Sequence, residues 1–457
     1  MNDLELFVKQ MQATNSNIEV LDCYFWGYTI PQISKEFDLL RFGKNNIVNI
    51  ELKSENTGVK IYKQLIKNYY YLDFLKKEIN CYTYVSSENK LYGLDRDKML
   101  CTVSFGELYG ILNNQKVIAI DDIDKLFKPS NYLVSPFNST DEFMGSKYFL
   151  TSRQDEIKQD CINRIEKKGT TFISICGKAG TGKSLLTFDI AKEFMVRKQK
   201  ILIIHCGMLN EGHHKLNNDY GWNIIAVKSM RPNDFSAYDL IIIDECQRIY
   251  PSQLENVINQ IKAIKSNCIF SYDNQQCLRQ WEINNDISKL ILDKTSSVFF
   301  ELTEKIRTNK EIASFIIALF NKSKTIEKFV RQNVELSYFD SAKDAKKFIK
   351  LLGGYGWKII NYTPSNRDTH PYDEYKILYE NNAHEVIGQE FDKVVAVIDH
   401  SYVYNGNNLD VKYSKSPYYH PVKMLFQIMT RTRIKLHVVV INNEEILARC
   451  TSILDYD

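Results

Sequence analysis

The sequence lacks the features that mark secreted, membrane-bound and disulfide- or zinc-framed proteins. No stretch approaches the roughly 18 consecutive apolar residues of a membrane-spanning helix, and the N-terminus, MNDLELFVKQ, has no signal-peptide pattern. The ten cysteines form no C-x-x-C pair, and several lie inside apolar runs, as Cys176 and Cys206 do. The neighbours His213 and His214 have no matching ligand set and are typical of a solvated helix start. We therefore expect a cytoplasmic protein with reduced cysteines and no membrane segment.

The sequence also has no strong excess of charge. Its formal net charge is +3, with 25% of residues charged and 44% hydrophobic, as in a typical globular chain. Any contact with nucleic acid must therefore come from local basic patches. A length of 457 residues exceeds one compact core, so we expect two or three domains. Proline, asparagine and serine without periodicity predict a linker over residues 121–148, after a first domain over residues 1–120.

The string GKAGTGKS at residues 177–184 is the most specific motif in the chain. It matches G-x-x-x-x-G-K-[ST], the phosphate-binding loop of nucleotide hydrolases, between an apolar strand-like run and an amphipathic helix. Its glycines allow the tight turn that points backbone N–H groups at phosphate oxygens. We expect ATP as the ligand, with Lys183 at the β- and γ-phosphates and Ser184 on Mg²⁺. The predicted nucleotide-binding residues of this loop are Gly177, Lys178, Ala179, Gly180, Thr181, Gly182, Lys183 and Ser184.

Strand-like and helical patterns alternate after this loop, which predicts a parallel α/β sheet. The apolar run at residues 240–243 ends in the acidic pair Asp244 and Glu245. Ligand chemistry in such sheets takes place at the carboxyl ends of the strands. We therefore expect Asp244 to hold Mg²⁺ through water and Glu245 to orient or deprotonate the attacking water.

Several further strings resemble the motifs of superfamily 1 helicases and fall in the same order. They are LTSRQ at residues 150–154, DECQR at 244–248, SYDNQQ at 271–276, LTEKIR at 302–307, HEVIGQEFD at 384–392 and IMTRTR at 428–433. The DECQR string is closest to the Schlafen-like branch, the domain of unknown function 2075. The resemblance covers roughly residues 148 to 457 and implies two RecA-like lobes with parallel sheets, over residues 149–300 and 301–457.

The resemblance also implies roles for single residues. It makes Gln154 the residue that reads adenine, Arg307 a contact of the γ-phosphate and Arg431 an arginine finger. The further residues that it places at the nucleotide are Gln276, Gly388 and Glu390. The spacings leave no room for large inserted domains, and the third motif departs from its usual opening, which argues against processive unwinding more than against ATP hydrolysis.

A second constellation lies in the N-terminal half. Residues 37–42 and 47–52 are predicted to form two strands joined by a tight turn. Strand alternation places Glu51 and Lys53 on one face, which Asp38 joins if the strands pair in the expected register. Asp38 and Glu51 would then hold Mg²⁺ or Mn²⁺, and Lys53 would position the attacking water for phosphodiester hydrolysis.

This arrangement resembles the PD-(D/E)xK nucleases, in which D…E-x-K on a hairpin precedes a helix. The resemblance implies a mixed α/β domain like that of restriction endonucleases, with Gln64 on the following helix assisting at the metal or phosphate. The interpretation is an ATP-dependent enzyme that cleaves or processes DNA or RNA, with antiphage defence as a role implied by such fusions. Two alternatives remain: a nucleotide switch that binds without cleavage, and a repair helicase with a degenerate nuclease domain. A protein partner or a homo-oligomer is not readable from the sequence.

Overall fold

The computed structural model describes residues 2–15, 17–30, 35–127, 134–148, 150–167, 169–230, 235–273, 276–277, 282, 284–303, 309–324, 332–365, 368–412 and 418–455. The chain divides into two compact units, Met1–Tyr132 and Leu133–Asp457. All ten cysteines lie in the described ranges, and none of them forms a disulfide.

The N-terminal unit is a six-stranded mixed sheet in the order β1-β2-β3-β4-β5-β6, in which only β3 and β4 pair in parallel. Its elements are α1 (Asn2–Thr14), η1 (Ile18–Leu21), β1 (Phe25–Thr29), β2 (Glu36–Phe42), β3 (Asn46–Lys53), α2 (Val59–Asp73), β4 (Glu78–Val85), β5 (Lys90–Leu94), β6 (Leu100–Val103), α3 (Phe105–Asn114) and η2 (Ile123–Lys125). The parallel pair requires a crossover, which α2 provides. The expected mixed α/β domain is therefore present.

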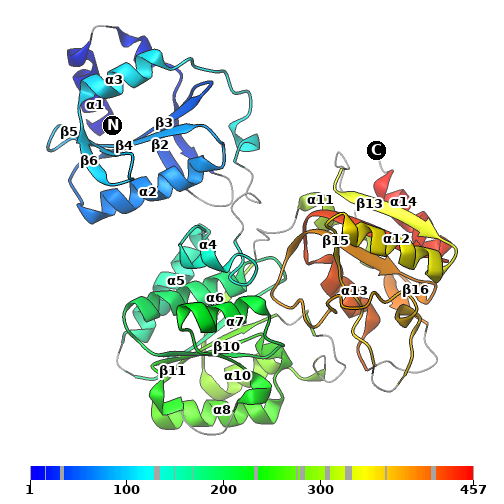
Figure 1. The fold of residues 1–457 in the computed structure, drawn as a ribbon. Coiled ribbons are helices and arrows are strands. Elements are labelled where there is room, and N and C mark those ends of the chain that lie inside the picture. Colours follow the sequence, from blue (N-terminus) through cyan, green and yellow to red (C-terminus); the bar gives the residue numbers. More distant parts are fainter. Residues whose placement is uncertain are drawn as a thin grey trace. The chain divides into compact units, whose positions relative to one another are not determined.

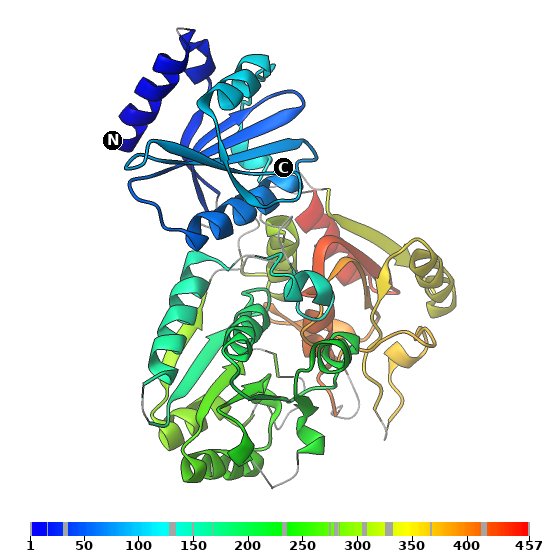
Figure 2. The same ribbon diagram turned by 60° about the vertical axis from the view of Figure 1, so that its left-hand side comes forward.

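Helices cover both faces of this sheet (Figure 2). On one face, α1 and α3 pack against the strands through side chains such as Phe7, Leu108 and Ile50. On the other face lies α2, whose Gln64 contacts Glu51 of β3. Alternation along β3 thus turns Asn49 and Glu51 toward α2, and Val48 and Ile50 toward the core under α1 and α3.

The boundary between the two units falls inside the segment expected to be a linker. The second half of that segment belongs to the C-terminal unit, where α4 (Thr140–Met144) and the residues around it pack. Phe137, Phe143 and Tyr148 are buried there, with Phe143 stacked on Tyr148 at 5.1 Å between ring centroids. Three aromatic anchors in a proline- and serine-rich stretch give no periodic pattern, so the sequence alone does not reveal this packing.

The first lobe of the C-terminal unit is an all-parallel sheet in the order β12-β7-β11-β10-β8-β9, with helices on both faces (Figure 1). Its elements are α5 (Ser152–Ile165), β7 (Phe172–Gly177), α6 (Lys183–Val196), β8 (Ile201–His205), α7 (Glu211–Tyr220), β9 (Ile224–Ala226), η4 (Val227–Ser229), η5 (Phe235–Ala237), β10 (Leu240–Asp244), η6 (Cys246–Arg248), α8 (Pro251–Ile264), β11 (Asn267–Tyr272), α10 (Ile287–Thr295) and β12 (Val298–Leu302). Every residue of β8 and β10 is buried, as expected for central strands covered on both faces.

The second lobe has a four-stranded parallel sheet, β13-β18-β15-β14, and a separate hairpin, β16-β17. Its elements are α11 (Lys310–Phe320), β13 (Val334–Phe339), α12 (Ala342–Gly354), β14 (Lys358–Ile359), η7 (Pro371–Asp373), β15 (Phe391–Ile398), β16 (Tyr402–Asn405), β17 (Asn408–Val411), α13 (Pro421–Met429), β18 (Thr432–Ile441) and α14 (Glu444–Leu454). The two parallel sheets and the mixed N-terminal sheet confirm the expected α/β fold class.

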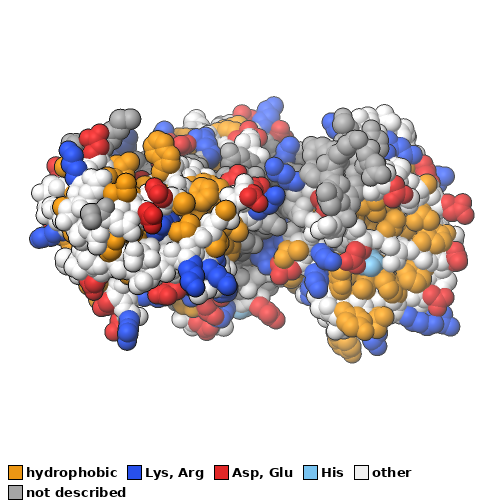
Figure 3. Space-filling model, turned by 90° about the horizontal axis from the view of Figure 1, so that it is seen from above, with side chains coloured by type: hydrophobic (Ala, Val, Ile, Leu, Met, Phe, Trp, Pro, Cys, Tyr) orange, Lys and Arg blue, Asp and Glu red, His pale blue; other side chains and the backbone are white. Residues whose placement is uncertain are grey.

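The surface carries both signs of charge. On the face shown in Figure 3, acidic and basic side chains are intermixed, consistent with the small net charge. No helix among the described residues is long and apolar enough to cross a membrane.

Candidate functional site

The phosphate-binding loop connects β7 to α6 in the predicted order. Gly180 and Gly182 have φ angles of +78° and +80°, in the left-handed region that favours glycine. A Cβ on Gly177 would lie 2.6 Å from the Thr181 hydroxyl, so this position has no room for a side chain. Helix α6 begins at Lys183. Because the first N–H groups of a helix have no partner within it, the loop and helix end offer donors and a positive dipole to an anion.

Gln154 of α5 is hydrogen-bonded to the phosphate-binding loop. It lies at the third position of α5, where its Oε1 accepts from the Thr151 N–H at 2.9 Å, and its Nε2 donates to the Thr181 carbonyl at 3.0 Å. A Cβ on Gly182 would lie 2.3 Å from the same Nε2. Both ends of the Gln154 amide are thus used within the protein, and its side chain is buried. These contacts support a role in positioning the loop, whereas the helicase resemblance implies contact with adenine.

Lys183 is buried at the start of α6 and points toward the end of β11. Its Nζ lies 3.7 Å from an oxygen of Asp273 and 3.3 Å from the Lys178 carbonyl. Phosphate oxygens would compete with both of these partners for the ammonium group. The lysine is therefore already held at the loop, where the motif places it.

The acidic pair occupies the end of β10 and the residue after it. Asp244 is buried, and its Oδ2 lies 3.0 Å from Nδ1 of His205 at the end of β8. Glu245 has a φ angle of +55°, in the left-handed region that costs energy for a non-glycine residue. Such strained positions recur at functional sites.

Two neighbours of the acidic pair hold Glu245 in place. Gln247 donates to Glu245 at 2.7 Å and accepts from the Asp273 N–H at 3.1 Å. Arg248 donates to Glu245 at 3.3 Å and to the Gln276 carbonyl at 2.9 Å. Burial opposes ionisation of Glu245, but the positive charges of Arg248 and Lys183 outweigh it and lower the pKa of this carboxyl. Glu245 is therefore held as a carboxylate, the form that a base requires.

The second lobe contributes three of the predicted residues to the same cleft. The side chains and backbone that line it are Ala179, Gly180, Gly182, Lys183, Ser184, Glu245, Gln276, Gly388, Glu390 and Arg431. Arg431 is buried, and it donates to the Gln389 carbonyl at 3.2 Å. Burial lowers the pKa of Arg431, while the carboxylates of Glu390 and Glu245 act in the opposite direction. Arg307 lies outside the described residues.

The polar groups of this cleft fit ATP and Mg²⁺. Oδ1 of Asp244 and Nε of Arg431 are buried and have no hydrogen-bond partner within the described part of the chain. An unpaired buried polar group is costly, and a ligand that pairs with it relieves the cost. Asp244 and Ser184 offer the oxygen ligands that Mg²⁺ prefers, and Arg431 offers a donor for a phosphate oxygen.

The predicted residues of the N-terminal unit also converge. Glu51 is buried, accepts from Asn68 at 2.7 Å and Asn49 at 3.2 Å, and is bonded by the Gln64 amide of α2. Asp38 accepts from the Leu52 N–H at 2.8 Å, next to Glu51 along β3. The helix residue expected to assist thus touches the carboxylate expected to bind metal.

Burial and the neighbouring charges change the pKa of Glu51 in opposite directions. Burial raises the pKa of Glu51, and the negative charge of Asp38 adds to the rise, while Lys35 at 3.6 Å lowers it. A divalent cation beside Asp38 and Glu51 would offset the same repulsion. The fit is partial, because amide and ammonium donors already occupy both oxygens of Glu51, and among the described residues no group of three or more His, Cys, Asp or Glu side chains forms a metal site. Lys53 is half-buried two residues further along β3.

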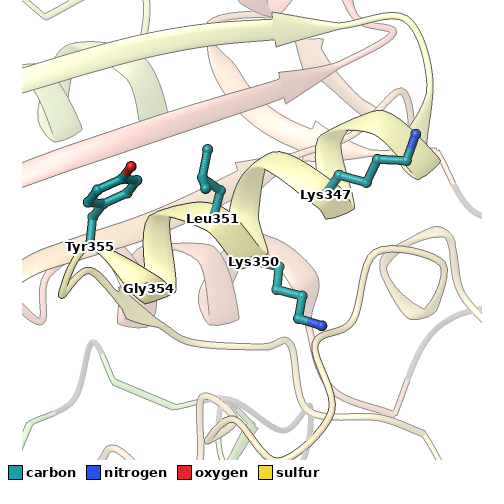
Figure 4. A pocket seen from close by; sticks show the side chains of 5 residues that line it. All are labelled: Lys347, Lys350, Leu351, Gly354 and Tyr355. Atoms are coloured by element: carbon teal, nitrogen blue, oxygen red, sulfur yellow. The ribbon is translucent and has the colours of Figure 1, made fainter.

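A second hollow lies on α12 of the second lobe (Figure 4). It is lined by Lys347, Lys350, Leu351, Gly354 and Tyr355. Lys350 points to the opposite side of the helix from Leu351. The polar groups of this hollow do not converge on one point, as the polar groups of a ligand-binding site do.

Several residues at the nucleotide cleft were not assigned from the sequence. They are His205, Gln247, Arg248 and Asp273, of which the last three fall inside strings that resemble helicase motifs. In the N-terminal unit, Asn49, Asn68 and Lys35 were likewise not assigned. A buried asparagine such as Asn68 interrupts the apolar stripe of its helix, and that interruption is the signal that was available.

Comparison with known proteins supports the helicase-like part of this description. The model of the Schlafen group 3 DNA/RNA helicase domain matches residues 170–353, which include the phosphate-binding loop and the acidic pair. No curated protein matches the sequence. The family match agrees with the helicase-like ATPase expected from the motifs, and it does not extend to the N-terminal unit.

Solved structures give weaker similarities. The Pif1 helicase from Candida albicans aligns with 67% of this chain and 99% of its own, at 12% identity and a TM-score of 0.36. Domain III of the replication initiation protein DnaA from Thermotoga maritima aligns with 39% of this chain and 72% of its own, at 16% identity and a TM-score of 0.25. AMPPCP-bound DnaA from Aquifex aeolicus aligns with 35% and 50%, at 13% identity and the same score.

Proposed function

We propose that the C-terminal unit hydrolyses ATP between its two lobes and uses this to act on DNA or RNA. The observation that carries the proposal is the single cleft that brings Lys183, Glu245 and Arg431 together from distant parts of the chain. The match to a DNA/RNA helicase domain supports nucleic acid as the partner.

Each residue of the cleft has a separable task. The loop N–H groups and Lys183 would bind the phosphates, and Glu245, held as a carboxylate, would take a proton from the attacking water. Arg431 would stabilise negative charge that develops on the transferred phosphoryl group. Mg²⁺, held by Ser184 and Asp244, would neutralise phosphate charge when bound.

We expect the full chain to hydrolyse ATP in the presence of Mg²⁺, with a rate that rises several-fold when single-stranded DNA or RNA is added. Lys183→Ala should lower the rate about 100-fold or more, because the removed ammonium contacts the reacting phosphates. Phosphate release measured beside Lys167→Ala, which changes an exposed lysine just after α5, provides the check. A hydrolysis rate that does not change when nucleic acid is added would favour the nucleotide switch. A wild-type rate in Lys183→Ala would refute the proposed site.

A second candidate function belongs to the N-terminal unit. We propose that it is a Mg²⁺- or Mn²⁺-dependent nuclease in which Asp38 and Glu51 hold the metal and Lys53 and Gln64 assist. The convergence of Asp38, Glu51 and Gln64 from β2, β3 and α2 supports this assignment. Cleavage of foreign nucleic acid, as in antiphage defence, is the role proposed for the two activities together.

Cleavage of labelled DNA and RNA should be lost, by about 100-fold or more, in Glu51→Gln and Lys53→Ala. Glu51→Gln keeps the shape of the side chain but has one oxygen fewer for the donors around it, so its folding is checked by circular dichroism and Lys53→Ala serves as the second variant. Lys9→Ala, an exposed lysine on α1, is the control, and ATP is added or withheld in each reaction. Equal cleavage by all variants would rule out this cluster, and strand displacement on a forked duplex without any cleavage would favour the repair helicase.

A further inference from the structure

His205 and Asp244 form a buried pair at the carboxyl end of the first-lobe sheet. They end the adjacent parallel strands β8 and β10 and are partners in the strand register. The His205 side chain is fully buried, and its Nδ1 lies 3.0 Å from Oδ2 of Asp244. A carboxylate only accepts hydrogen bonds, so Nδ1 carries the hydrogen and donates it.

The surroundings fix the position of this imidazole. A Cβ on Gly207 would lie 2.7 Å from Nε2 of His205, so the glycine makes room for the ring. On another side, the ring of His213 lies 4.5 Å away between centroids. Packing on two sides leaves the His205 ring little freedom to turn. The direction of its hydrogen bond to Asp244 is therefore fixed as well.

The pair leaves one oxygen of Asp244 available. With Oδ2 bonded to His205, Oδ1 is buried without a partner in the described part of the chain. The imidazole donates to Oδ2 alone, so it fixes the orientation of the carboxylate and leaves Oδ1 for a ligand.

We propose that His205 is a positioning residue that orients Asp244 so that Oδ1 faces the bound Mg²⁺ or its water. This inference rests on the proposed ATPase function and adds to it a residue outside the helicase-like motifs. Outer partners of this kind typically contribute about 10- to 100-fold to metal affinity.

The test compares three variants of the full chain. His205→Leu removes the donor, and His205→Asn restores one, because its Nδ2 occupies nearly the place of Nδ1. His213→Leu is the matched control, since it removes a second buried imidazole from the same cluster, fills a similar volume beside the His205 ring and does not touch Asp244. Two quantities are measured: the Mg²⁺ concentration that gives half-maximal ATP hydrolysis, and the affinity for a non-hydrolysable ATP analogue with Mg²⁺ and with EDTA, by calorimetry.

We expect His205→Leu to raise the Mg²⁺ requirement about 10- to 100-fold. It should also lose most of the affinity gained from Mg²⁺ while keeping the wild-type affinity in EDTA. His205→Asn and His213→Leu should resemble the wild type. If His205→Leu does not fold, His205→Gln replaces it, because its amide reaches the place of Nε2 and cannot donate to Asp244 in the same geometry.

Two results would overturn the proposal: an unchanged Mg²⁺ dependence in His205→Leu, or an equal change in His213→Leu, which would assign the effect to packing. A wild type that neither hydrolyses ATP nor binds the analogue is a different result. It would overturn the proposed ATPase function and, with it, the role of His205.

Discussion

At the scale of single residues, His213 shows how burial controls charge near the nucleotide cleft. It stacks on Phe137 at 4.2 Å, and its Nδ1 accepts from the Asn210 N–H at 3.2 Å. Burial lowers its pKa well below the usual value, and neighbouring His205 and His214 lower it further. The solvated helix start expected for this residue is therefore wrong, because the ring packs under the segment that precedes α4.

The burial of His213 predicts that the protein loses stability as the pH falls. Below about pH 6.5 the unfolded chain binds a proton at His213 and the folded chain does not, so the free energy of unfolding falls as the pH drops. His213→Leu keeps the volume but cannot titrate, and we expect its melting temperature to fall less than that of the wild type between pH 7.5 and 5.5. Thermal melts at both pH values test this, and equal falls in the two proteins would contradict it.

At the scale of elements, Gly212 lets α7 approach the segment before α4. A Cβ on Gly212 would lie 2.3 Å from both Cα and the carbonyl oxygen of Phe137, and backbone atoms do not yield easily. The ring of the same Phe137 lies 2.9 Å from a Cβ built on Gly388. One aromatic residue thus packs between helix α7 and the loop that carries Gly388.

Gly212→Ala should therefore lower the free energy of unfolding by about 1–3 kcal/mol. Gly354→Ala is the matched control in the same unit, since Gly354 lies in helix α12 and a Cβ there meets nothing within 4 Å. That change should stabilise by about 0.4–1 kcal/mol, because alanine has less freedom to lose on folding. Urea unfolding measures both, and a Gly212→Ala protein as stable as the wild type would contradict the packing described.

Elements with local signals were predictable from the sequence. The hairpin expected over residues 37–42 and 47–52 forms β2 and β3, since its strands and turn are neighbours in the chain. The contact of Gln154 with Thr181 and the pairing of His205 with Asp244 were not predicted. Both join residues more than twenty-five positions apart, and only the completed sheet brings them together.

At the scale of the whole molecule, the ATPase unit assembles one site from two lobes. The first lobe supplies the phosphate loop and Glu245, and the second supplies Arg431 from the turn between α13 and β18. Neither lobe holds the complete proposed set. Catalysis, as opposed to binding, should therefore depend on the second lobe.

Replacement of Arg431 tests this claim most directly. Arg431→Ala should bind ATP within a few-fold of the wild type and hydrolyse it about 1,000-fold more slowly, as expected for loss of an arginine finger. Arg433→Ala, which removes a surface arginine paired with Asp392, is the matched control and should keep the wild-type rate. A full hydrolysis rate in folded Arg431→Ala would contradict the composite two-lobe site, and a selective loss of the rate with binding retained would establish it.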